Sequence, residues 1–159
     1  MTIHLICVGA LRERHWREAS DEYRKRLGKY CTLTTDEIKE ARVPEKPSPA
    51  EVSAAKDAEG RELLRRVRSG SYVIALDARG AALSSEAFAE KLAALPHAGA
   101  GRVAFLTGGP LGLADAVLAR ADLRLSLSEM TFPHRMARVI LLEQLYRAFK
   151  ILRGEAYHK

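Results

Sequence analysis

Long hydrophobic runs and cysteines are both scarce in this sequence. No apolar run approaches the ~18 residues of a membrane span, and the apolar start lacks the basic region of a signal peptide. We therefore expect a cytoplasmic protein that makes no membrane contact. The two cysteines, Cys7 and Cys31, have no metal-binding spacing and predict reduced core thiols, so no bound metal is expected.

Several catalytic motifs are also missing. The sequence has no HExxH, no CxxC and no recognisable Ser-His-Asp spacing. The isolated carboxylates Asp77 and Glu129 are more typical of caps or turns than of general bases. Composition and spacing alone predict a basic α/β domain with a ligand site at the ends of the third to fifth strands.

Composition is that of an ordinary globular domain. The chain has 159 residues, of which 47% are hydrophobic and 29% charged, and residues 1–159 are predicted to form a single domain. The formal net charge is +6, which is compatible with a polyanionic partner but does not require one.

Strand-like and helix-like segments alternate along the chain. This alternation predicts an α/β domain of three layers with a mainly parallel sheet. Arg79-Gly80 is expected to turn the chain, and Ser48-Pro49 to start a helix. The predicted strands cover 2–9, 31–38, 71–77, 101–107 and 123–128, and the predicted helices cover 16–27, 50–68, 84–95, 113–120 and 135–152.

The last predicted helix, 135–152, is apolar around much of its circumference, from Met136 and Val139 to Phe149. Such a helix needs cover on two sides. The sheet supplies one, and the other is either a further element of the chain or, as we prefer, a second subunit at a two-fold interface.

The stretch FLTGGPLGL, residues 105–113, leaves a predicted strand and breaks into glycines. It has neither the Lys-Ser/Thr of a P-loop nor the spacing of a dinucleotide fingerprint, and Pro110 removes a backbone donor. Phosphate binding is therefore disfavoured. A ligand loop at the carboxyl end of a parallel strand and a plain turn both remain open.

A second candidate loop, LSLSEMTFPH at 125–134, carries the large apolar residues Met130 and Phe132. They are either buried under the loop or form an apolar slot for an adenine or a thioether. His134 is either a helix-start residue or a functional one, and Arg138 is placed to face an anion. The end of the chain, with Tyr157 and His158, is either frayed or folded back over a site.

Three motifs occur together in this chain: VIALD, LTGGPLGL and the block from LSLSEMTFPH to the end. With the segment VGALRERHWREASDEYRKRLGKY near the start, they resemble the ribosomal large subunit pseudouridine methyltransferase H family of the SPOUT superfamily. The resemblance covers nearly the whole chain. It implies a trefoil-knotted α/β fold, a homodimer, and S-adenosylmethionine as methyl donor. The positions that match the family's cofactor loops are Leu76, Gly108, Gly109, Leu127, Ser128, Glu129, Met130, Thr131 and Phe132.

The resemblance also implies methylation of N3 of a pseudouridine in 23S rRNA, on assembled ribosomes. We expect His134 or His158 to handle the N3 proton, Arg138 to stabilise the resulting charge, and Tyr157 to assist, with the tail able to act in trans. Two rival hypotheses stay open: the same chemistry on another RNA such as tRNA, and a non-catalytic, ribosome-associated RNA-binding factor.

Overall fold

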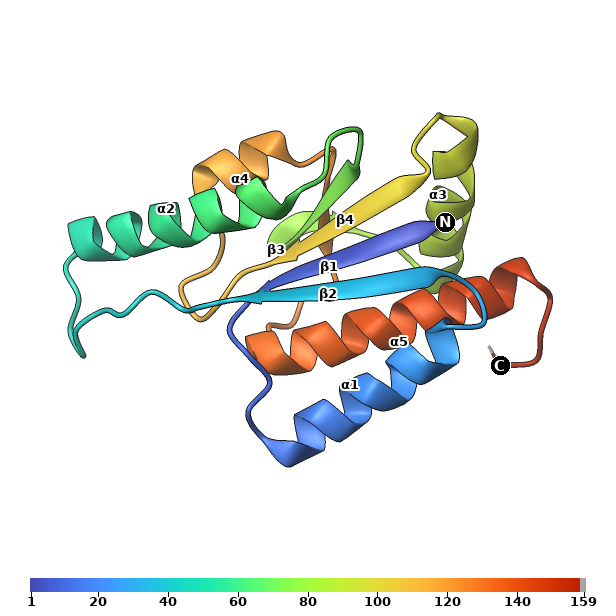
Figure 1. Ribbon diagram of the computed structural model, residues 1–159, viewed down its shortest axis with the longest axis horizontal. Helices are drawn as coiled ribbons and strands as arrows, with labels where there is room; N and C mark the ends of the chain where they lie inside the picture. The colour runs from blue at the N-terminus through green and yellow to red at the C-terminus, as the bar shows by residue number, and fades with distance from the viewer. Residues whose placement is uncertain (158–159) are drawn as a thin grey trace.

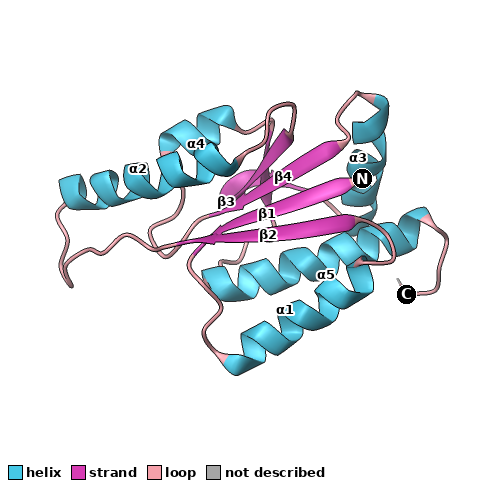
Figure 2. Cartoon of the chain, viewed as in Figure 1, coloured by secondary structure: helices cyan, strands magenta, loops and turns pink. Residues whose placement is uncertain are grey.

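Five parallel strands form one sheet in the order β2-β1-β4-β3-β5 (Figures 1 and 2). The structure, a computed structural model, describes residues 1–157. The order puts β4 at the centre of the sheet and β2 at an edge. The strands are β1 (Thr2–Val8), β2 (Thr32–Ile38), β3 (Tyr72–Ala82), β4 (Arg102–Thr107) and β5 (Leu123–Ser126).

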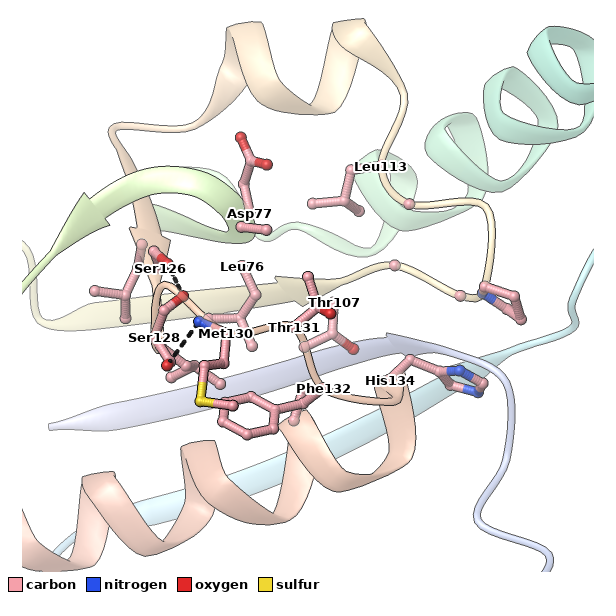
Figure 3. Close-up of a pocket in the computed structure, with 18 residues that line it drawn as sticks. Leu76, Asp77, Thr107, Leu113, Ser126, Ser128, Met130, Thr131, Phe132 and His134 are labelled. Atoms are coloured by element: carbon pink, nitrogen blue, oxygen red, sulfur yellow. Dashed lines mark hydrogen bonds between the residues drawn. The ribbon is translucent and has the colours of Figure 1, made fainter. Parts of the chain in front are cut away.

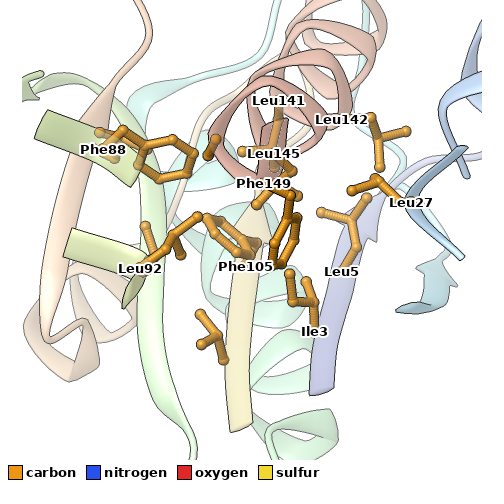
Figure 4. Close-up of a cluster of buried hydrophobic side chains, with 14 of the residues drawn as sticks. Ile3, Leu5, Leu27, Phe88, Leu92, Phe105, Leu141, Leu142, Leu145 and Phe149 are labelled. Carbon is orange, nitrogen blue, oxygen red and sulfur yellow. The ribbon is translucent and has the colours of Figure 1, made fainter. Parts of the chain in front are cut away.

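Helices cover both faces of this sheet, as the predicted three-layer α/β fold requires (Figure 1). One face carries α1 (Arg14–Leu27), α3 (Ser85–His97) and α5 (His134–Leu152), and the other carries α2 (Pro49–Arg66) and α4 (Asp115–Arg120). Under the first face, Phe105 of β4 packs among Phe88, Leu92 and Leu145 (Figure 4). Each such side chain contributes about 1.5–3 kcal/mol by leaving water.

Two local predictions had opposite outcomes. Ser48 caps α2 with a full capping box to Glu51, and a proline follows in the first turn, as predicted. The predicted turn at Arg79-Gly80 is wrong, because β3 continues through both residues to Ala82, with a shift of register after Leu76. At Gly80 a Cβ would lie 2.6 Å from the backbone of Arg124, so glycine is needed for strand approach rather than for turning.

Helix α5 is covered by the sheet on one side and flanked by α1 and α3. Helices of the same chain therefore bury much of the apolar surface of α5 that the sheet leaves uncovered. Met136, Val139 and Ile140 near its start stay half-exposed. Neither α5 nor any other helix within residues 1–157 has the length and hydrophobicity to cross a membrane.

Candidate active site

A cavity of about 320 Å³ opens at the carboxyl ends of β3, β4 and β5 (Figure 3). Its volume is within the range of small-molecule sites, and strand ends are where open α/β sheets bind ligands. The lining residues are Leu76, Asp77, Ala78, Thr107, Gly108, Gly109, Pro110, Gly112, Leu113, Leu125, Ser126, Leu127, Ser128, Met130, Thr131, Phe132, His134 and Ala137. All predicted cofactor residues except Glu129 are among them.

Two large apolar side chains stand at this cavity in contact with water. Met130 is 75% exposed and Phe132 is 37% exposed (Figure 3). Simple burial under the loop, one of the two interpretations of this segment, is therefore excluded for Met130. Exposed apolar side chains around a concave site gain free energy when a flat apolar ligand covers them.

The segment between β5 and α5 is held in shape by its own serines. The Ser126 hydroxyl donates to the Ser128 carbonyl at 2.8 Å, and the Met130 N–H donates to the Ser128 hydroxyl at 3.0 Å (Figure 3). Such local bonds stabilise irregular backbone in place of a helix or strand. Glu129 is exposed and lies outside the cavity lining.

The glycine loop after β4 is folded against itself and against β1. A Cβ on Gly108 would lie 2.8 Å from the carbonyl carbon of Gly112, and one on Gly109 would lie 2.9 Å from Val8. The Gly112 N–H donates to the Gly109 carbonyl at 3.0 Å. These glycines are thus required for the loop's own packing, which shapes one wall of the cavity.

Gly108→Ala is expected to displace this loop, because the added methyl group meets backbone that cannot rotate away. Overpacking of this kind costs about 1–3 kcal/mol of stability. Because the loop shapes one wall of the cavity, its displacement should also lower cofactor affinity roughly 10-fold or more, about 1.4 kcal/mol for each factor of ten. Isothermal titration calorimetry with S-adenosylmethionine measures the loss. Gly101→Ala is the control, since its Cβ would enter open space at the amino-terminal edge of the sheet. Equal affinity of the two variants would contradict this role of the loop.

His134 begins α5 at the rim between the cavity and the end of β2. Its Nε2 is buried without a hydrogen bond, 3.6 Å from Oε1 of Glu40. Burial lowers the pKa of His134 below 6.5, and the neighbouring Glu40 carboxylate raises it by less. The imidazole is therefore neutral at physiological pH and able to accept a proton.

The other predicted catalytic residues lie elsewhere. Arg138 is 4% exposed, does not line the cavity, and forms an ion pair with Glu37 at 2.7 Å. Tyr157 packs against Tyr146 with ring centroids 4.9 Å apart, and its hydroxyl donates to Glu143 at 3.2 Å. It thus lies beside the second half of α5, nine to twelve residues along the helix from His134. His158 lies outside the described residues.

Sequence reasoning left out several lining residues, notably Asp77, Thr107 and Ser126. Asp77 does cap the Arg79 N–H at 3.1 Å, as a turn residue would, and it pairs with Arg124 at 2.5 Å. Burial raises the pKa of Asp77, but the bonds from Arg124 and Arg79 outweigh burial and hold it below 3.8. Position along the strands could have indicated all three. Thr107 and Ser126 are the last residues of β4 and β5, and Asp77 directly follows the part of β3 that pairs with its neighbours.

A parallel α/β sheet with a ligand-sized cavity at its strand ends defines the class of small-ligand-binding α/β proteins. The chain belongs to the SPOUT methyltransferases, because the family model described as "Predicted SPOUT methyltransferase" matches residues 1–158. S-adenosylmethionine is the methyl donor of this family.

Full-length relatives bear a common name. The chain is 48% identical over 159 residues to "Ribosomal RNA large subunit methyltransferase H" of Clostridium acetobutylicum, and 47% identical to the protein of that name from Clostridioides difficile, with 100% of each chain covered. Among solved structures, a probable methylase family protein from Haemophilus influenzae Rd KW20 matches with a TM-score of 0.55 at 16% identity, covering 99% of this chain and 70% of that one. That likeness supports the fold.

The cavity fits such a donor chemically. The exposed Met130 and Phe132 offer apolar contacts to an adenine, while the neighbouring backbone of 127–132 offers polar groups to its edge. No group of three or more side chains suited to hold a metal ion occurs among residues 1–157. The trefoil knot implied by the resemblance stays a prediction.

Proposed function

We propose that this protein methylates N3 of a pseudouridine in 23S rRNA on assembled ribosomes, using S-adenosylmethionine. The observation that carries the proposal is a cavity at the strand ends with exposed apolar side chains and, at its rim, an imidazole whose Nε2 has no hydrogen bond. The name shared by the full-length relatives supports a ribosomal RNA substrate. A ribosomal substrate also implies a cytoplasmic location.

The cofactor-binding residues in this proposal are those of the three loops at the cavity. Leu76, Met130 and Phe132 flank the adenine, and backbone groups near Leu127, Ser128 and Thr131 bind its edge. Gly108 and Gly109 shape the wall, and Glu129 contributes only through its backbone. When bound, S-adenosylmethionine supplies an electrophilic methyl group on a sulfonium, with a neutral leaving group.

The residues of this chain then supply orientation and proton handling. N3 of pseudouridine carries a proton, and its lone pair becomes a nucleophile as that proton leaves. The imidazole of His134 accepts the proton, which contributes about 10²–10⁴ in rate. Arg138 lies one helical turn further along α5, but its ion pair with Glu37 neutralises its charge, so we assign it the part of holding the start of α5 against β2 rather than of contacting the anion formed at N3.

A homodimer completes the proposed enzyme. The half-exposed Met136, Val139 and Ile140 at the start of α5 are available to a two-fold partner. Such packing also allows Tyr157 and His158 of one subunit to approach the His134 cavity of the other.

Ribosomes lacking the modification test the proposal directly. Incubation with the protein and labelled S-adenosylmethionine should place one methyl group on a pseudouridine of 23S rRNA, located by nucleotide mapping. Free 23S rRNA and tRNA serve as comparison substrates. Methylation of tRNA alone would contradict the proposed substrate, and cofactor binding without methylation of any of the three RNAs would indicate a non-catalytic factor.

A further inference from the structure

A second, larger cavity of about 810 Å³ lies at the carboxyl ends of β1 and β2, beside the candidate active site. Consecutive residues at the start of α5 line the two cavities, His134 the first and Arg135 the second. The second cavity, which we call the basic groove, is lined by Gly9, Ala10, Arg12, Glu37, Ile38, Lys39, Glu40, Ala41, Arg42, Val43 and Arg135.

Ion pairing within the chain leaves a net positive charge in the basic groove. The Glu37 carboxylate is matched by Arg138 at 2.7 Å, and the Arg135 guanidinium is matched by Glu13. By contrast, Arg12, Lys39 and Arg42 are exposed and form no ion pair within residues 1–157.

The remaining carboxylate of the groove, Glu40, lies at the boundary between the two cavities. Its Oε1 is 3.6 Å from Nε2 of His134, and a Cβ on Gly9 would lie 2.3 Å from the same oxygen. Gly9 has φ +82°, so glycine satisfies both the backbone and the space that Glu40 needs. Glu40 is therefore directed toward His134 rather than toward the three unpaired cations.

We propose that the basic groove binds the phosphates of the RNA strand that carries the target nucleotide, an inference that rests on the proposed function. Its three unpaired cations come from separate segments, the β1–α1 connection, the end of β2 and the loop before α2. Cations distributed along an open groove match a chain of phosphates better than a single anion.

The position of the groove links RNA binding to the chemistry. Phosphate contacts set the register of a strand without reading its sequence. Because His134 and Arg135 are adjacent, a strand held in the groove has a neighbouring base within reach of the cavity. The groove thus supplies position, and the ribosomal RNA structure supplies the choice of nucleotide.

The triple variant Arg12→Gln, Lys39→Gln, Arg42→Gln tests this inference on the full-length protein. Loss of three phosphate contacts should weaken ribosome binding about 10- to 100-fold and reduce the slope of log Kd against log salt by roughly 2. KM for ribosomes should rise in parallel, while kcat and the affinity for S-adenosylmethionine stay at wild-type values. Filter binding over a range of KCl concentrations, with steady-state methylation, gives these quantities.

The matched control is Arg61→Gln, Lys91→Gln, Arg102→Gln, which removes the same charges from exposed sites on α2, α3 and the start of β4. Equal KM and salt slope in the two triple variants would overturn the groove assignment. Weaker ribosome binding with an unchanged salt slope would also overturn it and indicate a ribosomal protein as the contact. Failure of the wild-type protein to methylate ribosomes would instead contradict the proposed function itself.

Discussion

Replacing His134 by glutamine is expected to lower kcat for methyl transfer about 10²–10⁴-fold, because the imidazole takes the N3 proton as the methyl group is transferred. Glutamine retains a polar group of similar size at the start of α5, so the fold should persist. Ribosome KM and cofactor affinity should stay near wild-type values. Single-turnover methylation of ribosomes by pre-formed enzyme–cofactor complex measures the chemical step.

The pH dependence of kcat is a second test of His134 as the base. Burial lowers the pKa of His134 below 6.5, so the imidazole is neutral, and active as a base, at and above pH 6.5. We expect kcat to fall only as the pH drops below 6.5, through the lowered pKa, and the His134→Gln variant to lack this acidic limb.

The Glu40→Gln variant tests the same pH dependence of kcat from the side of the neighbouring carboxylate. The Glu40 carboxylate raises the pKa of His134, so its removal should move the acidic limb to still lower pH. An acidic limb that persists unchanged in His134→Gln, or that does not move in Glu40→Gln, would contradict the assignment of His134 as the base.

Local patterns in the sequence predict the elements of this fold well. Capping at Ser48 and the β-branched run at 71–77 each depend on neighbouring residues, and both have the expected structure. The prediction of a turn at Gly80 is wrong because the role of this glycine depends on a residue distant in the sequence. That glycine accommodates the backbone of Arg124, which is 44 positions away in the sequence and is brought there only by strand order.

The candidate site likewise has residues that local sequence patterns predict and contacts that they do not predict. Gly108, Met130 and His134 follow strands or begin a helix, and the meeting of parallel strand ends brings them to one cavity. The pairing of Arg138 with Glu37 joins α5 to β2 across 101 positions, so no spacing rule could have indicated it. It leaves His134 as the one predicted catalytic residue at the cavity within residues 1–157.

Deleting residues 155–159 is expected to abolish methylation while leaving folding and cofactor binding intact. The deletion removes the Lys150–Glu155 ion pair and the contact between Tyr157 and Tyr146. Neither Glu155 nor Tyr157 belongs to the two hydrophobic clusters that hold the helices on the sheet, so the domain should stay folded. Thermal unfolding and calorimetry check those two properties. Methylation of ribosomes at the wild-type rate would contradict a catalytic part for the tail.

Tyr157→Phe separates the hydroxyl from the packing of the tail. The ring contact with Tyr146 persists in this variant, whereas the hydrogen bond to Glu143 is lost. A fall in kcat with unchanged thermal stability would assign a catalytic part to the hydroxyl. Wild-type kcat in this variant would leave His158 as the tail residue to replace next.

Mixed dimers decide whether the tail acts across the subunit interface. Within one chain, Tyr157 contacts Glu143 and Tyr146, which lie nine and twelve residues along α5 from His134, a rise of roughly 14–18 Å. In a two-fold dimer the start of one α5 is able to meet the end of the other. Mixing the inactive His134→Gln and tail-deleted proteins should then restore activity, because one of the two sites in each mixed dimer combines an intact His134 with an intact tail. With random exchange of equal amounts, roughly a quarter of all sites are complete. A tail that acts on its own subunit predicts no recovery at any mixing ratio.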